Sequence, residues 1–568
     1  MTPVNKSGTF RWEARAHVEF LCISLQSGAT LLEAVGFEPP IRRPTCNPAE
    51  QSMPQAETSP LADDSLVHHG ASKSALRTIE AEQLLPEGLV RRLHTLYPHY
   101  SNLDATSKPI FVDKESYSGL QGFREVWDIL DAQGVDIGHK DERELFIDVY
   151  RFLATRHTLN SIDWSDFSND SMFQLVFPQP GMIRKEVVEA YSAATSREAR
   201  ERIAAAHMRE TNPHDGKQLL NKPWLIDSEG KIHIVPGSQH KYPQIQLIFD
   251  HTTQNCFSYC TYCFRHAQVR GDEDMFVQRD IEQIHSYLRA HAEVDDILIT
   301  GGDAGYISPE RFERYTKPLI VDPSLMHVKV VRLGSRALSY HPELILKPSY
   351  DRMLALFDRL NQNGIQVAWM AHFSTPRELL NPLTLAAIRR LQRHQVVVRS
   401  QSPIMRHISL FEDTQGKIDV ERSARNWIDL ANIMSMLSIG FHSIYCARPT
   451  GEHQYFTAPL ADLHKVFDKV YRSLPSLSRP SRHLSMTTSA GKISILGTTE
   501  VKGETYFALK FTEGRNMEWL DKVFLAKYDQ RTNNVALLEP LEGGKFFFEA
   551  ELEGIEKQLE ETLGQVEP

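Results

Sequence analysis

Short apolar runs alternate with amphipathic segments along the second half of the chain. After Trp224, six runs rich in Val, Ile, Leu and aromatic residues follow one another: IQLIFDHT, DDILITGG, HVKVVRLGS, IQVAWMAH, HQVVVRSQS and SIGFHSIYC. Segments with apolar residues at spacings of three and four separate them, as in ERFERYTKPL and DRMLALFDRLNQNG. This alternation predicts repeated βα units and a parallel sheet or barrel. Any chemistry is then expected at the carboxyl ends of the strands.

The parts of the chain before and after these runs follow other patterns. In residues 78–212, segments such as FREVWDILDAQG and RELFIDVYRFLATRH have helical spacing, which predicts a helical accessory region. Residues 39–74 are rich in Pro, Ser, Ala and acidic side chains without apolar periodicity, which is typical of a disordered linker or tail. Near the C-terminus, YFALKF, KVFLAKYD and KFFFEAEL indicate a small mixed α/β region.

The hydrophobic content, net charge and number of cysteines make several classes of function improbable. The chain has 568 residues and 41% hydrophobic content, enough for a sizeable core. A net charge of -10 and a pI near 6.2 argue against binding to nucleic acid or to an anionic membrane, and no apolar stretch is long enough to span a bilayer. Six cysteines are too few for a disulfide scaffold, so we expect a reducing, cytoplasmic setting. The first residues leave a mitochondrial address open.

Three cysteines lie on one short predicted loop. Cys256, Cys260 and Cys263 have the spacing C-x3-C-x2-C. Three thiolates on one loop can occupy three corners of a [4Fe-4S] cluster and leave the fourth iron open for a chelating ligand such as S-adenosylmethionine. The alternative is a structural zinc site with His266 as the fourth ligand, although such sites usually divide their ligands into two spaced pairs. The remaining cysteines are expected to be ordinary thiols: Cys22, Cys46 and Cys446.

The motifs around this loop resemble a known family. The cysteine spacing, Tyr262 before Cys263 and the later DILITGGDA are similar to the radical S-adenosylmethionine superfamily. Within it, the chain resembles the lysine 2,3-aminomutase family, in order, from HKYP through CFSYCTYCFR, TGGDA, VRLGSR, AHFSTP, SQSPIMR and YFTAP to SAGK. The resemblance implies that residues 224–498 form a partial (β/α) barrel. The sequence patterns place a disordered or targeting tail at 1–75, a helical accessory region at 76–223 and a small mixed α/β region at 499–568.

The resemblance also implies the chemistry. In that family a reduced [4Fe-4S] cluster cleaves S-adenosylmethionine, and the resulting 5'-deoxyadenosyl radical takes a hydrogen from carbon 3 of an amino acid. Pyridoxal 5'-phosphate holds the amino group as an imine while nitrogen migrates from carbon 2 to carbon 3. The implied partners are a small amino acid and a reductant such as flavodoxin or ferredoxin, and a homo-oligomer is compatible with the family.

Individual residues take their expected roles from the resemblance. Lys492, in SAGK, corresponds to the catalytic lysine that forms the imine with pyridoxal phosphate, and Lys241 to an arginine that contacts the cofactor phosphate. Arg265 corresponds to the arginine that holds the substrate α-carboxylate, which a planar guanidinium can do with two hydrogen bonds. The positions expected to bind S-adenosylmethionine are Gly301, Gly302, Asp303, His372 and Gln401. Arg332 and Arg336 also match the family, without a definite role.

The match fails where lysine-specific members recognise the distal ammonium. Two aspartates do this in the family, and here the corresponding positions are Ser485 and, depending on the alignment gap, Ala447 or Arg448. A distal ammonium would be poorly compensated in such a pocket, whereas an inward Arg448 would favour a distal carboxylate. We therefore expect a 2,3-aminomutase for glutamate or another non-lysine amino acid. The alternatives are lysine 2,3-aminomutase proper, a radical enzyme without pyridoxal phosphate, and a non-enzymatic zinc protein.

Overall fold

The computed structural model describes residues 71–100, 109–211, 220–270, 276–447, 453–520 and 522–564. The expected tail over residues 1–75 lies outside these ranges except for its last five positions, where helix α2 (Lys73–Ala81) begins. Within the described ranges, no helix is both long and apolar enough to cross a membrane.

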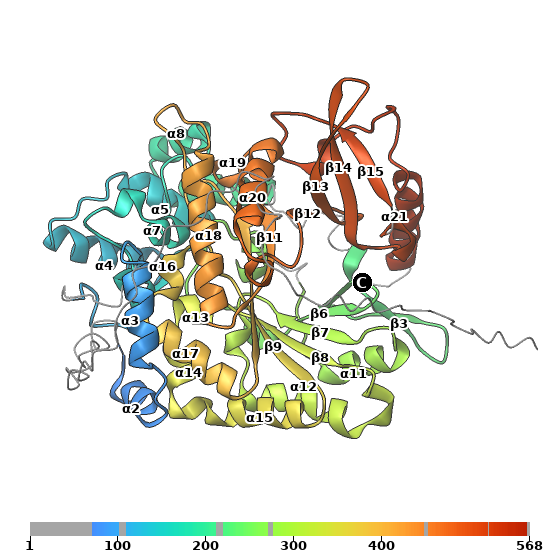
Figure 1. Ribbon diagram of the computed structural model, residues 1–568, viewed down its shortest axis with the longest axis horizontal. Helices are drawn as coiled ribbons and strands as arrows, with labels where there is room; N and C mark the ends of the chain where they lie inside the picture. Colours follow the sequence, from blue (N-terminus) through green and yellow to red (C-terminus); the bar gives the residue numbers. More distant parts are fainter. Residues whose placement is uncertain are drawn as a thin grey trace, which may run out of the picture. The chain divides into compact units, whose positions relative to one another are not determined.

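One mixed sheet of eleven strands organises the described residues (Figure 1). Its strands, from one edge to the other, are β5 (Ser238–Tyr242), β6 (Ile245–Phe249), β7 (Asp296–Thr300), β8 (Val330–Gly334), β9 (Gln366–Ala371), β10 (Val397–Ile404), β11 (Gly440–Cys446), β12 (Ser485–Thr487), β13 (Gly491–Val501), β14 (Glu504–Gly514) and β15 (Val523–Lys527). Strands β6 to β12 pair in parallel, while β5 and β13 to β15 pair antiparallel. Five of the six apolar runs contain one of the strands β6 to β9 and β11, and the sixth contains most of β10, which confirms the α/β class. The pairing does not show a closed barrel.

Buried and half-buried residues alternate along the strands, so the sheet has one face in the core and one more open face. In β10, the even-numbered residues from Val398 to Ile404 are buried and the odd-numbered ones are half-buried. Strands β7 and β8 repeat this pattern. Successive side chains of a strand point to opposite faces, so one face of the sheet packs into the core while the other carries Gln401 and Arg332 towards a cavity.

Helices follow the strands and cover the core face. They are α11 (Ile281–Ala290), α12 (Pro309–Val321), α15 (Asp351–Gln362), α17 (Pro382–Arg393), α18 (Val420–Met436) and α20 (Leu460–Ser473). Figure 1 shows α11, α12 and α15 along one side of β7 to β9. The sequence starts α12 and α17 in the same way, because Ser308 and Asn381 accept hydrogen bonds from the first turn and a proline follows each.

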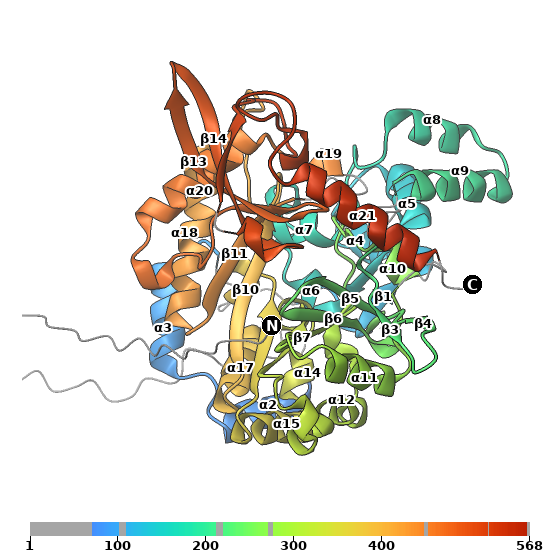
Figure 2. The same cartoon turned by 90° about the vertical axis from the view of Figure 1, so that its right-hand side faces the viewer.

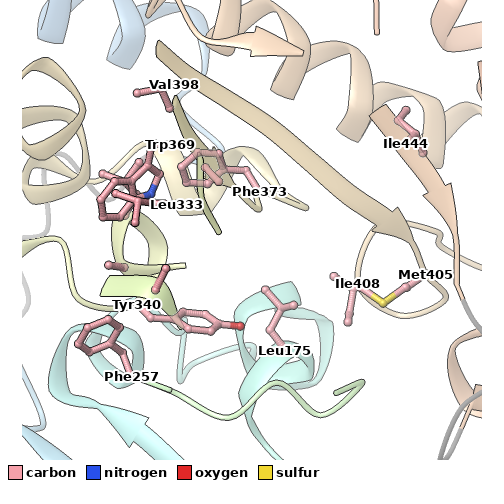
Figure 3. Packing of buried hydrophobic residues seen from close by; sticks show 14 of the residues in the cluster. Leu175, Phe257, Leu333, Tyr340, Trp369, Phe373, Val398, Met405, Ile408 and Ile444 are labelled. Atoms are coloured by element: carbon pink, nitrogen blue, oxygen red, sulfur yellow. The ribbon is translucent and has the colours of Figure 1, made fainter. Parts of the chain in front are cut away.

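The N-terminal part of the described chain is mostly helical. Its helices are α3 (Glu87–Leu96), α4 (Gly119–Ala132), α5 (Lys140–Val149), α6 (Arg156–Asn160), α7 (Ser171–Val176), α8 (Lys185–Ala193) and α9 (Arg197–Glu210), with a short pair of strands, β1 (Ser116–Ser118) and β2 (Leu153–Thr155). This region shares one hydrophobic core with the sheet. Figure 3 shows Leu175 of α7 beside Tyr340, with Phe257 close by and Leu333 and Trp369 of the sheet above.

The C-terminal region continues the sheet. The expected boundary after residue 498 lies inside β13, which forms a long hairpin with β14. Helix α21 (Glu549–Leu563) lies beside this hairpin (Figures 1 and 2), and Trp519 Nε1 donates a hydrogen bond to Glu551 of that helix over 2.8 Å. The last apolar run, KFFFEAEL, leads into α21 rather than forming a strand.

Candidate active site

A cavity of about 390 Å³ lies at the carboxyl ends of the parallel strands. Ligand sites of parallel α/β sheets occupy this position, and the sequence pattern predicted it. The predicted site residues that line the cavity are Lys241, Cys256, Cys260, Cys263, Arg265, Gly301, Gly302, His372, Gln401 and Lys492. Asp303 does not line it, and Arg448 lies outside the described residues.

The cysteine loop is anchored to the helical region by backbone hydrogen bonds. The Tyr259 N–H donates to the Leu153 carbonyl over 2.7 Å, and the Thr261 N–H donates to the Leu175 carbonyl over 3.0 Å. If the three cysteines are metal ligands, their loop would need such fixed points, because the ligands would have to keep their spacing. The helical region therefore supports the site directly, by way of β2 and α7.

The three thiols of the loop face the cavity and form no disulfide. Burial raises the pKa of the Cys263 thiol to about 12 and the pKa of Cys256 well above its ordinary value, and the neighbouring thiols raise both further. Thiolates at these positions need a compensating positive charge, and a metal centre supplies one because coordination deprotonates a thiol. Three such thiols on one cavity wall fit an iron-sulfur cluster.

His266 does not complete a zinc site with these cysteines. Its Nε2 lies 3.1 Å from the Thr211 carbonyl, and its ring packs edge-on against Tyr150 with centroids 5.0 Å apart. The described residues contain no group of three or more His, Cys, Asp or Glu side chains that could hold a single metal ion. A cluster spreads its thiolates over several iron atoms, so the same geometry suits a cluster better than one zinc ion.

The glycine turn after β7 packs against the cysteine loop. A Cβ atom on Gly302 would lie 2.5 Å from the Asn255 carbonyl oxygen and 2.9 Å from Cys256 Sγ. Gly301 has φ +146° and equally little space, since its Cβ would lie 2.5 Å from Thr253 Oγ1. The sequence predicted that these glycines permit a close backbone approach to a ligand; the close approach that the structure shows is to the loop that carries the first cysteine.

Asp303 lies behind this turn. Its Oδ1 accepts a hydrogen bond from the Gly305 N–H and its Oδ2 one from the Arg336 N–H, each over 2.8 Å. Burial raises the pKa of its carboxyl to about 6, although these hydrogen bonds oppose the rise. Asp303 therefore joins the ends of β7 and β8 through these backbone bonds, and the Ser335 side chain also hydrogen-bonds to its carboxylate.

Arg336 is a functional candidate whose role was not predicted from its motif. Its guanidinium donates to the Tyr262 hydroxyl and to Glu378, and its Nη1 lies 3.8 Å from Cys260 Sγ. Tyr340 adds its hydroxyl 3.2 Å from the same sulfur. Hydrogen bonds to cluster sulfurs tune the redox potential of iron-sulfur centres. The sequence signal that was available is the match of VRLGSR to the family.

Lys492 lines the same cavity and has aromatic neighbours. Its Nζ is 5.9 Å from the ring centroid of Tyr242 and 5.3 Å from that of Tyr445. It forms an ion pair with Glu513, whose Oε2 is 2.7 Å from Nζ. Lys241 is close by, donating to the Thr488 carbonyl. A lysine, flat aromatic faces and a second cation can together hold an aromatic aldehyde that carries a phosphate.

The remaining predicted residues, Arg265, His372 and Gln401, also line the cavity. Arg265 lies over the ring of Phe249, 4.6 Å from its centroid, with Nη1 3.5 Å from Thr300 Oγ1. Burial and the nearby guanidinium groups lower the pKa of His372 to about 3, so it is a neutral imidazole at physiological pH. Gln401 accepts a hydrogen bond from the Tyr445 hydroxyl over 3.1 Å.

Charges in the cavity favour anionic groups. Among the described residues that line it, Glu513 is the sole carboxylate, and it already pairs with Lys492 and Arg482. Ala447 lines the cavity, whereas Ser485 is buried and does not. Cys446 is a buried thiol, as expected, and it also reaches the cavity wall.

Known proteins similar to this chain are aminomutases. A putative L-lysine 2,3-aminomutase of Aquifex aeolicus (strain VF5) is 29% identical over 274 residues, which cover 48% of this chain and 67% of that protein. The L-lysine 2,3-aminomutase of Clostridium subterminale is 30% identical over 34% of this chain and 43% of its own length. The glutamate 2,3-aminomutase of Clostridioides difficile (strain 630) is 22% identical over 52% of this chain and 65% of its own length.

These matches cover only part of this chain and part of each relative. The chain spans 43% to 67% of the length of these three relatives. No protein-family model matches it. A crystal structure of Streptococcus suis SuiB aligns with 52% of this chain and 69% of its own, at 13% identity and a TM-score of 0.20, which is too low to support any argument.

Proposed function

Because the chain belongs to the lysine 2,3-aminomutase-like family of radical S-adenosylmethionine enzymes, we propose that it is a radical amino-acid 2,3-aminomutase. Such an isomerase moves the α-amino group of its substrate to carbon 3. The observation that carries the proposal is that one cavity is lined by the three cysteines, Arg265 and Lys492. We extend the proposal to the sheet, whose strands β6 to β11 would form the partial barrel expected of this superfamily.

The residues present fit the cofactors of this family. Cys256, Cys260 and Cys263 would hold a [4Fe-4S] cluster and leave one iron for S-adenosylmethionine. When bound, S-adenosylmethionine and the reduced cluster supply a 5'-deoxyadenosyl radical, and pyridoxal 5'-phosphate supplies the conjugated system that the migrating amino group crosses. A reductant such as flavodoxin or ferredoxin would supply the electron.

Each side chain has a role that its position supports. Lys492 would hold the pyridoxal aldehyde through its amine, with Lys241 as the point charge for the phosphate. Arg265 would hold the substrate α-carboxylate and so fix carbon 3 in front of the radical. The anchored cysteine loop would keep water from this reaction by closing one wall of the cavity.

The substrate is proposed to be glutamate or another amino acid that lacks a distal ammonium. A desolvated ammonium needs an opposing carboxylate, and the one carboxylate that the described lining offers, Glu513, is already shared by two cations. The glutamate 2,3-aminomutase among the relatives shows that the family is not restricted to lysine.

Anaerobic reconstitution followed by a substrate panel tests the proposal. The purified chain should hold about four irons and should convert glutamate or alanine to the corresponding β-amino acid faster than lysine. β-Lysine as the main product would contradict the substrate assignment but not the reaction class. Protein that binds zinc in place of iron, or that holds no pyridoxal phosphate, would contradict the reaction itself.

A further inference from the structure

The hairpin of β13 and β14 places a carboxylate directly opposite Lys492. The two strands pair with Lys492 across from Glu513, next to a shift in register at Ile493. Lys492 Nζ lies 2.7 Å from Glu513 Oε2, and each side chain is only 13% exposed. Both residues line the cavity. The pair is therefore held by the backbone of two adjacent strands, inside the proposed site.

A second cation shares this carboxylate. Arg482, in the loop before β12, places Nη1 2.5 Å from Glu513 Oε1. Burial by itself would raise the pKa of Glu513, but the charges of Lys492 and Arg482 outweigh it and lower the pKa to about 2. Glu513 is thus ionised at any physiological pH, and its two oxygens divide between two cations.

Among the described residues that line the cavity, no second carboxylate lies beside Lys492. The nearby Asp296 of β7, which interacts electrostatically with Glu513, pairs with Arg332. Strand β5 presents Tyr242 and Lys241, and β11 presents Tyr445 and His442. Burial and the surrounding cations lower the pKa of His442 to about 3, so its ring is neutral. Among the described residues that line the cavity, Glu513 is the one acid that can balance the Lys492 ammonium.

We propose that Glu513 is the positioning residue that keeps the Lys492 nitrogen paired and oriented, and that opening of this pair controls when the amine reacts with an aldehyde. The inference rests on the proposed function of Lys492. An ammonium has no lone pair, so Lys492 must first release a proton to solvent; the amine then forms a C=N bond with the aldehyde carbon, and the aldehyde oxygen leaves as water. Glu513 opposes the first step, and Arg482 weakens that opposition by competing for the carboxylate.

The experiment measures how Lys492 reactivity depends on pH. Full-length protein is incubated with pyridoxal 5'-phosphate over a pH series and reduced with borohydride, and modification of the peptide that contains Lys492 is measured by mass spectrometry. In Glu513→Gln, the midpoint of labelling should move to lower pH by about one to three units, as expected for loss of an opposite charge at this distance. In Arg482→Gln, the midpoint should move to higher pH.

Two control variants test whether the shift in the labelling midpoint comes from the charge of Glu513. Glu504→Gln makes the same chemical change on the same strand, at an exposed residue outside the cavity, and should leave the midpoint unchanged. Glu513→Asp keeps the charge and should restore the midpoint towards that of the original chain. A purely structural role for Glu513 would alter unfolding without moving the labelling midpoint.

The outcomes separate this inference from the proposed function. An unchanged midpoint in folded Glu513→Gln would overturn the inference and leave the function intact. If Glu513→Gln does not fold, Arg482→Gln decides the matter, since a midpoint that stays in place or moves to lower pH overturns the inference as well. If the original chain is never labelled at Lys492 while another lysine is, the assignment of the cofactor lysine fails instead.

Discussion

At the scale of single residues, Gly302 is the position where a small change should affect the cysteine loop most directly. The Cβ of Gly302→Ala would come within 2.9 Å of Cys256 Sγ and 2.5 Å of a backbone oxygen, so the loop must move. We expect a loss of about 1–3 kcal/mol in the free energy of unfolding, the usual cost of overpacking. Less iron should also be retained after anaerobic reconstitution, as measured by metal and sulfide analysis.

Gly334→Ala is the matched control for this prediction. Gly334 also ends a parallel strand and lines the cavity, but the nearest atom to its added Cβ would be 3.4 Å away. This variant should retain the iron content of the original chain. Equal iron content in the two variants would show that the Gly302 approach does not hold Cys256 in place.

The sequence predicted many of the motif residues that line the site, but it did not predict the side chains with which they interact. The cysteines, Arg265 and Lys492 stand in motifs with fixed spacing, and the structure brings them to one cavity. Glu513 has no motif, because it reaches Lys492 only by pairing across the β13–β14 hairpin. Asp303 shows the opposite case, because it stands within a motif but its carboxylate accepts hydrogen bonds from the backbone of Gly305 and Arg336 and from Ser335.

At the scale of secondary-structure elements, the short helix α7 is expected to stabilise the cysteine loop. Leu175 is fully buried beside Tyr340 (Figure 3), whose hydroxyl lies 3.2 Å from Cys260 Sγ, and the Leu175 carbonyl accepts the Thr261 N–H. Leu175→Ala should cost about 2–5 kcal/mol in the free energy of unfolding. It should also speed the release of iron to an added chelator, followed by the colour of the iron complex.

Leu130→Ala controls for the loss of stability alone. Leu130 is equally buried but belongs to α4, which packs against β1, α5 and β2 and takes no part in the backbone hydrogen bonds that anchor the cysteine loop to β2 and α7. Its substitution should reduce stability by a similar amount without faster iron release. If both variants release iron at the same rate, general loosening of the helical region would explain the effect and α7 would have no special role.

The sequence predicted the strands that have a strong local apolar pattern. It did not predict how the strands of the C-terminal hairpin extend the sheet. Strands β6 to β11 each follow from an apolar run because a sheet covered by helices needs such runs. The boundary after residue 498 divides β13 because YFALKF, which forms most of the partner strand β14, lies beyond a turn at Lys502 and Gly503. Local propensity does not show that two segments on either side of a turn extend one sheet.

At the scale of the whole molecule, the site draws on segments from Tyr150 to Glu513, so it depends on most of the described chain. Sequence order could place the parallel strands in one sheet, since βα units add strands side by side. It could not show that the helical region supplies backbone acceptors to the cysteine loop, as Leu153 and Leu175 do. Those bonds join residues that are far apart in sequence and carry no motif of their own.

The spread of the cavity-lining residues along the chain predicts how the protein responds to truncation at either end. All described residues belong to one unit, Thr58–Pro568, so a chain that begins at Thr58 contains every described residue lining the cavity. It should match the full chain in iron content after reconstitution and in labelling of Lys492.

A chain that ends at Val501 removes a stretch of comparable size but loses β14, exposing the edge of β13. It should aggregate, because an unpaired strand edge invites pairing with other chains. Loss of iron from the first truncation would show that residues before Thr58 contribute to the site.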